Sequence, residues 1–139
     1  MVSSFHRLLL ASTLLGLASC QKEATTPAST TLDGTWRLTN RQCYCAPAPV
    51  PDETVTFTTT RFTFYSGNRG MRLGDYTLGT AAVPCLNNGT TGPALQLTYL
   101  NATAVPGPPP IQYRLDGNTL TLDYGGPCDA PVDTYKRLP

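Results

Sequence analysis

Cysteines are the residues of this 139-residue chain whose type and spacing point most directly to chemistry. They stand at five positions: Cys20, Cys43, Cys45, Cys85 and Cys128. The four that follow Cys20 make an even number, which in an exported domain predicts two disulfides. Zinc ribbons need two close C-x₂₋₄-C pairs, whereas this chain has a single close pair with one residue between its members. The chemistry expected of these four cysteines is therefore cross-linking, and no metal site is expected.

Cys20 has a different role, because it ends a segment with the layout of an export signal. Arg7 supplies a positive charge, and residues 8–17 form an apolar run of about ten residues, too short for a membrane span of about 20. The sequence LASC at 17–20 matches the lipobox of bacterial lipoproteins, in which the cysteine thiol is acylated and becomes the new N-terminus. We therefore expect cleavage before Cys20 and membrane anchoring through its lipid.

Removal of the signal peptide, residues 1–19, changes the charge of the remaining chain. It takes away Arg7, one of ten basic residues, and leaves equal numbers of basic and acidic side chains, so no nucleic-acid partner is expected. Residues 20–31 are polar and small and predict a flexible tether. Within them, the QKE sequence at 21–23 resembles the export tag of surface lipoproteins in Bacteroidota. We expect an outer-membrane lipoprotein on the periplasmic or surface-exposed face.

Catalysis is not expected from the residues that remain. The single histidine, His6, lies in the predicted signal peptide, so histidine triads and histidine metal sites are excluded from the mature chain. A cysteine nucleophile would have no histidine to activate it. Asp52 and Glu53 are adjacent, and neighbours on a strand face opposite sides, so they do not form an acid–base pair. We expect no catalytic residue, no cofactor and no enzymatic activity.

Two pairings of the four domain cysteines are compatible with the sequence. On an extended segment the side chains of Cys43 and Cys45 point the same way, and a bond between them would be strained. Each is therefore expected to reach a distant partner, as 43–85 with 45–128 or as 43–128 with 45–85. Bridges that close loops of roughly 40 to 85 residues would each add about 4 kcal/mol to stability.

The elements that must position these residues are short strands. Apolar and polar residues alternate with period two through residues 32–139, with turn signals about every ten residues, which predicts about eight strands. No helix is expected to cover an open sheet, and closure removes the sheet edges that invite aggregation. The sequence therefore predicts an all-β domain, a disulfide-stapled, antiparallel up-and-down barrel.

One predicted strand is irregular. Met71 and Leu73 alternate as apolar residues, and the alternation continues one position out of phase at Tyr76 and Leu78. The shift falls beside Gly74, and a one-residue slip next to glycine is typical of a β-bulge. We therefore expect a bulge that bends this strand.

Trp36 and Arg137 lie near opposite ends of the predicted domain in the sequence. The triplet Gly34-Thr35-Trp36 opens the first predicted strand, and Arg137 lies on the last one, on the same face as Tyr135. This pair resembles the lipocalin signature, in which a first-strand tryptophan packs under an arginine from the end of the barrel. The resemblance implies an eight-stranded lipocalin-like barrel plugged at one end by Trp36 and Arg137. The guanidinium would stack on the ring and bond to backbone carbonyls.

A lipocalin-like barrel implies a binding protein, and the sequence leaves two forms of binding open. In the first, a small hydrophobic ligand lies inside, against the aromatic residues of the apolar face: Phe57, Phe62, Phe64, Tyr99 and Tyr113. In the second, these aromatics fill the barrel, because eight strands are only just wide enough for side chains. The Pro-rich loops 46–51 and 106–110 would then contact a protein partner, as in a protease-inhibitor-type barrel.

Overall fold

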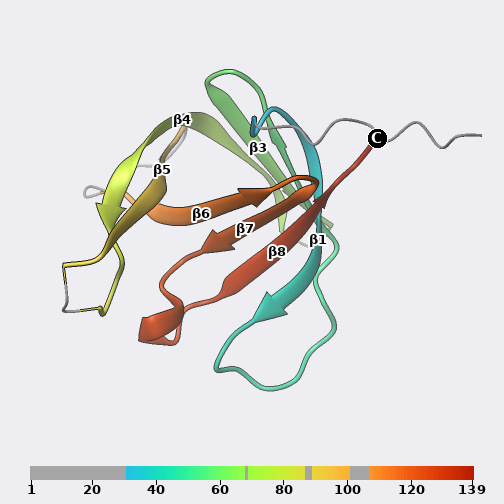
Figure 1. The fold of residues 1–139 in the computed structure, drawn as a ribbon. Coiled ribbons are helices and arrows are strands. Elements are labelled where there is room, and N and C mark those ends of the chain that lie inside the picture. Colours follow the sequence, from blue (N-terminus) through green and yellow to red (C-terminus); the bar gives the residue numbers. More distant parts are fainter. Residues whose placement is uncertain (1–30, 68, 87–88, 101–106) are drawn as a thin grey trace, which may run out of the picture.

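The computed structural model describes residues 31–67, 69–86, 89–100 and 107–139. In these residues eight antiparallel strands close into a barrel in sequence order (Figure 1). The strands are β1 (Gly34–Gln42), β2 (Glu53–Phe57), β3 (Arg61–Ser66), β4 (Gly70–Ala82), β5 (Thr91–Tyr99), β6 (Ile111–Asp116), β7 (Thr119–Asp123) and β8 (Val132–Arg137). The predicted all-β, up-and-down barrel is confirmed. The expected signal peptide, Cys20 and the tether up to residue 30 lie outside the described residues.

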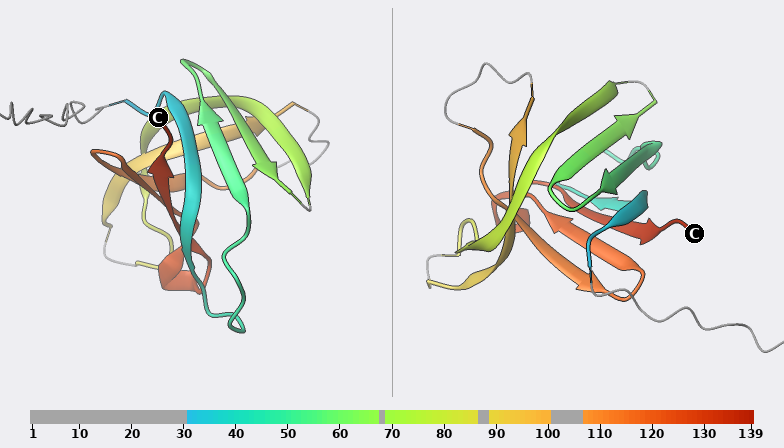
Figure 2. Two further views of the ribbon diagram at one scale, coloured as in Figure 1. Left: turned by 90° about the vertical axis from the view of Figure 1, so that its right-hand side faces the viewer. Right: turned by 90° about the horizontal axis from the view of Figure 1, so that it is seen from above.

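The barrel closes where its first and last strands meet. β8 pairs with β1 from Trp36 and Arg137 to Gln42 and Val132, so the start of β1 and the end of β8 lie side by side (Figure 2). This ladder shifts register between Leu38 and Asn40. Closure pairs β1 with β8, in keeping with the expectation that a closed barrel removes the edges of the sheet.

The interior of the barrel is filled by the apolar members of the alternating strands. Phe57 meets Tyr76 edge to face with ring centroids 5.2 Å apart, and Phe62 meets Phe64 and Tyr99 at 5.7 and 5.1 Å. Such edge-to-face pairs add to the burial of apolar area. The side chains that complete the buried apolar cluster are Leu32, Trp36, Leu38, Val55, Leu95, Leu97, Ile111, Leu120, Leu122 and Tyr135.

The bulge predicted in β4 is absent. β4 keeps one continuous register against β3 and β5 across Gly74. Gly74 and Tyr76 face the interior, while Met71 lies on the outer face and is 62% exposed. Gly74 allows the backbones of β4 and β5 to approach closely, because a Cβ at this position would lie 2.0 Å from the backbone oxygen of Thr98. The shift in phase of the apolar alternation arises because the strand also carries apolar residues on its outer face.

Gly74→Ala is expected to destabilise the barrel by about 1–3 kcal/mol, because the new methyl group must push apart two paired backbones. Gly79→Ala on the same strand is the control, because no atom lies within 4 Å of a Cβ there. Chemical denaturation followed by Trp36 fluorescence measures both variants. Equal midpoints for the two variants would contradict the close approach at Gly74.

The cysteine pairing expected from the sequence is wrong. Cys43 bonds to Cys45, and Cys85 bonds to Cys128. β1 ends at Gln42 and the chain bends at the next residues, so the Cα atoms of Cys43 and Cys45 are 5.2 Å apart. An extended strand would hold them about 6.6 Å apart. The second bond joins the β4–β5 turn to the 3-10 turn η1 (Gly126–Cys128) and staples elements distant in the sequence.

Candidate functional site

Trp36 and Arg137 stack in the arrangement that the lipocalin resemblance implies. The central guanidinium carbon of Arg137 lies 4.0 Å from the centroid of the Trp36 ring. The Trp36 Nε1 donates a hydrogen bond of 2.8 Å to the carbonyl oxygen of Leu32. Arg137 Nη1 donates to the carbonyl oxygen of Asp33, and Nη2 donates to that of Thr31 at 2.6 Å. These bonds hold the segment 31–33 across the end of the barrel.

Gly34 is required by this clamp. Its φ of +129° lies in a region that L side chains rarely adopt, and a Cβ there would lie 2.5 Å from Nη1 of Arg137. The glycine of the Gly34-Thr35-Trp36 triplet therefore gives the arginine access to the backbone. This explains physically why a glycine stands two residues before the tryptophan.

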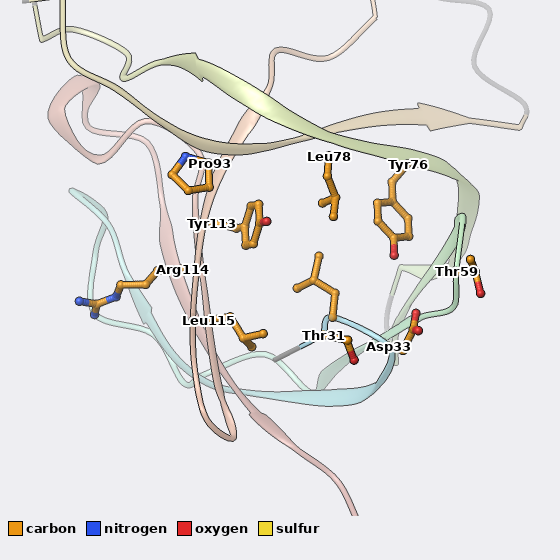
Figure 3. A pocket seen from close by; sticks show the side chains of 10 residues that line it. Thr31, Asp33, Thr59, Tyr76, Leu78, Pro93, Tyr113, Arg114 and Leu115 are labelled. Carbon is orange, nitrogen blue, oxygen red and sulfur yellow. The ribbon is translucent and has the colours of Figure 1, made fainter. Parts of the chain in front are cut away.

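A pocket of about 730 Å³ opens beside the clamped segment (Figure 3). Its walls come from the segment before β1, the β2–β3 turn, and strands β4, β5 and β6. The lining residues are Thr31, Leu32, Asp33, Thr59, Tyr76, Leu78, Pro93, Tyr113, Arg114 and Leu115. In the described residues β5 and β6 share two paired positions, Ala94 with Gln112 and Leu95 with Ile111. Beyond this short ladder Pro93 of β5 pairs with β4 and Tyr113 of β6 pairs with β7, and both residues line the pocket.

The pocket is mainly apolar, with a few polar groups at its edge. Figure 3 shows the side chains of Tyr76, Leu78, Tyr113 and Leu115 directed at a common space, while Arg114 points away from it. Burial raises the pKa of Tyr76 above its usual value, and the nearby Asp33 carboxylate and Tyr113 add to the rise. Tyr76 therefore stays protonated at neutral pH and can donate a hydrogen bond to a ligand.

The five aromatic residues predicted to line a ligand site lie in different parts of the barrel. Phe57, Phe62 and Phe64 are buried core residues and line no described pocket, because edge-to-face packing uses their surfaces. Tyr113 lines the 730 Å³ pocket, and Tyr99 lines a different, smaller one. The pocket wall also contains four residues that were not predicted to line a ligand site: Leu32, Tyr76, Leu78 and Leu115. Their apolar alternation was visible, but which end of each strand borders empty space was not.

A second cluster of side chains lies inside the barrel and carries charge. Arg41 donates from Nε and Nη2 to the two carboxylate oxygens of Asp133, at 2.7 and 2.6 Å. The hydroxyl of Tyr135 donates to Oε1 of Glu53 at 2.7 Å, and Arg41 Nη2 lies 3.7 Å from the same oxygen. Asp133 is 1% exposed and Glu53 is 5% exposed. The cluster ties together β1, β2 and β8, which are distant in the sequence.

The tyrosines of this cluster are held in their neutral form. Burial raises the pKa of Tyr135 far above its usual value, and Tyr124 and the hydrogen bond to Glu53 raise it further. Burial likewise raises the pKa of Tyr124, with the charges of Asp133 and Glu53 as further causes. Both oxygens of Asp133 accept bonds from Arg41, which fixes the orientation of this carboxylate. The arrangement is suited to holding strands together.

A small pocket of about 220 Å³ borders the cluster at the surface. Arg72 covers part of it, with its guanidinium carbon 5.4 Å from the centroid of Phe64 and 6.0 Å from that of Tyr99. These cation–π contacts close the aromatic core against water at this point. Arg72 also lies 3.9 Å from Glu53, so its charge is shared between the rings and the carboxylate.

Comparisons with known protein families, with curated proteins and with solved structures gave no match to this chain. Among the described residues, no group of three or more His, Cys, Asp or Glu side chains is placed to hold a metal ion. The same part of the chain contains no helix long and apolar enough to cross a membrane.

Proposed function

We propose that this chain is a lipid-anchored binding protein of the cell envelope, of lipocalin-like type, that holds a small hydrophobic ligand in the 730 Å³ pocket. The observation that carries the proposal is the pocket itself. Its volume lies within the roughly 300–1,000 Å³ usual for small-molecule sites, and three leucines and two tyrosines make up half of its ten lining residues. The stacked Trp36 and Arg137 support the lipocalin-like assignment.

The polar groups of the pocket suggest the form of the ligand. Asp33, Thr31 and Thr59 line it together with the two tyrosines, whereas its leucines offer only apolar surface. A ligand with an apolar body and one polar, hydrogen-bonding end would match this distribution, because the leucines offer apolar contact and the polar side chains at the edge can exchange hydrogen bonds with the ligand. The site lies beside the clamped segment 31–33, and Leu32 and Tyr76 of its wall also belong to the buried apolar cluster.

Leu78→Glu is expected to weaken binding of a neutral fluorescent probe such as N-phenyl-1-naphthylamine at least tenfold. The reason is that a carboxylate in an apolar pocket loses its hydration on contact with an apolar ligand. Met71→Glu, on the outer face of the same strand, is the matched control and should leave the affinity unchanged. Fluorescence titration measures both. Unchanged affinity for Leu78→Glu, or no binding by the wild type, would refute the ligand pocket.

The lipid anchor is tested separately at Cys20. Cys20→Ala is expected to shift the protein from the membrane fraction to the soluble fraction, because the acyl chains supply the membrane affinity. Globomycin should cause the uncleaved precursor to accumulate in cells that make the wild type. Cell fractionation and immunoblotting measure both effects, and normal processing in the presence of globomycin would refute the lipobox.

A second candidate function is binding of a protein partner through loops, and one observation favours it. The Pro-rich segment 46–51 is largely exposed and forms, with Arg41 and the first cysteine pair, a surface pocket of about 300 Å³. The other nominated loop, 106–110, is described only from residue 107. Replacement of residues 46–51 by a Gly/Ser segment should abolish partner capture without changing probe binding at the 730 Å³ pocket. Retained capture would remove this alternative.

A further inference from the structure

The Cys43–Cys45 disulfide lies outside the barrel wall. β1 ends at Gln42, and the residues between it and β2 belong to no strand. Cys45 is exposed, Tyr44 is 90% exposed and Cys43 is half-buried. Surface pockets of about 380 and 300 Å³ lie next to the pair, and Cys43 lines both of them. The sulfur atoms are therefore placed where another molecule can approach them.

The two disulfides of the domain differ in how strongly the fold holds their cysteines together. A disulfide stabilises a fold to the extent that the fold holds the two cysteines together, and the effect is reciprocal. Cys85 and Cys128 are 43 residues apart, and the packed barrel brings them into contact. Cys43 and Cys45 are two residues apart on a surface segment, so the barrel contributes little to keeping them bonded.

We propose that Cys43–Cys45 is a thiol–disulfide exchange site that accepts electrons from a protein dithiol, while Cys85–Cys128 is a structural bond. Exposed disulfides with little support from the fold have the more oxidising potentials and are the labile ones. Neither cysteine belongs to a strand or to the clamp at segment 31–33, so the Cys43–Cys45 bond takes part in no strand pairing. The site is independent of the ligand pocket.

The exchange proceeds in two displacements. A thiolate of the partner attacks Sγ of the exposed Cys45, a mixed disulfide forms and the Cys43–Cys45 bond breaks. Cys43 leaves as a thiolate and takes up the proton that the attacking thiol lost. The second thiol of the partner then attacks the partner's sulfur in the mixed disulfide and releases Cys45, which takes up the second proton. The partner dithiol loses two electrons and two protons, and the Cys43–Cys45 pair gains them.

Equilibration of the full mature chain in glutathione redox buffers, followed by alkylation and peptide mass mapping, tests this assignment. Cys43–Cys45 is expected to be half-reduced at a value of [GSH]²/[GSSG] at least tenfold lower than Cys85–Cys128, which corresponds to about 30 mV. Reduction of both pairs at the same value would overturn the proposal, as would a mapped pairing other than 43–45.

A thioredoxin variant that keeps only its attacking cysteine identifies the attacked sulfur. It is expected to form a mixed disulfide with Cys45 of the disulfide-bonded mature chain, because the probe has no second thiol to release the adduct. After acid quench and alkylation, peptide mass mapping should find at least fivefold less probe on Cys43, because Cys43 is half-buried. Near-UV circular dichroism reports whether the barrel of the trapped species is intact. Equal trapping at the two cysteines, or none, in a folded chain would refute attack at Cys45.

Discussion

Asp133→Asn is expected to lower the free energy of unfolding by about 3 kcal/mol, because it leaves the Arg41 guanidinium without its buried counter-charge. Both carboxylate oxygens of Asp133 accept bonds from Arg41, and the carboxylate is 1% exposed. The effect falls at the lower end of the range for broken buried pairs. Arg41 keeps some contact with water, and Glu53 lies 3.7 Å from its Nη2.

The exposed pair between Arg61 and Asp75 provides the matched control for this measurement. Its closest atoms are 3.5 Å apart and both side chains are more than half exposed. Asp75→Asn should therefore change the unfolding free energy by less than about 1 kcal/mol. Urea denaturation at neutral pH measures both variants. Similar losses for the two would mean that the buried cluster does not hold β1 to β8.

The second large effect is expected at alkaline pH. In the folded barrel the pKa values of Tyr124 and Tyr135 are raised above the usual value, whereas in the unfolded chain both tyrosines ionise near pH 10. Above that pH the unfolded state binds fewer protons than the folded state. The stability contribution of the two tyrosines is therefore complete below pH 10 and is lost as the pH rises further. Two such groups give a loss of about 2.7 kcal/mol per pH unit.

Denaturation curves between pH 8 and 12 test this slope. Tyr124→Phe should reduce it by about 1.4 kcal/mol per pH unit, because one ionising group is removed from the unfolded state. Tyr44→Phe removes the hydroxyl of an exposed residue and is the control, with the wild-type slope expected. A wild-type slope of zero above pH 10 would show that these two tyrosines ionise equally in the folded and unfolded states.

The barrel was predictable from the sequence because its physical cause is local. Alternation with period two fixes which side chains face inward, and the turn residues fix where each strand ends. The stacking of Arg137 on Trp36 was expected because the pair resembles the lipocalin signature, and the two side chains do stack. Around Met71 the strand carries apolar residues on both faces, so the sequence pattern predicted a β-bulge where the strand is regular.

The cysteine pairing and the polar cluster were not predictable for a different reason. The Cys43–Cys45 bond depends on a bend immediately after β1, and the sequence pattern favoured a continued strand there. The bond from Tyr135 to Glu53 joins residues 82 positions apart, and the register that brings them together is a property of the closed barrel. The pocket likewise depends on how far β5 and β6 stay paired, which alternation does not encode.

The clamp made by Arg137 also has a mechanical consequence. Its guanidinium holds the carbonyl oxygens of Thr31 and Asp33, and the backbone N–H of Leu138 donates to the carbonyl of Thr35 at 2.8 Å. A pulling force applied to the segment before β1 is therefore shared at once by the first and last strands. The force acts on the pairing between β1 and β8, so neither terminal strand separates from the barrel alone.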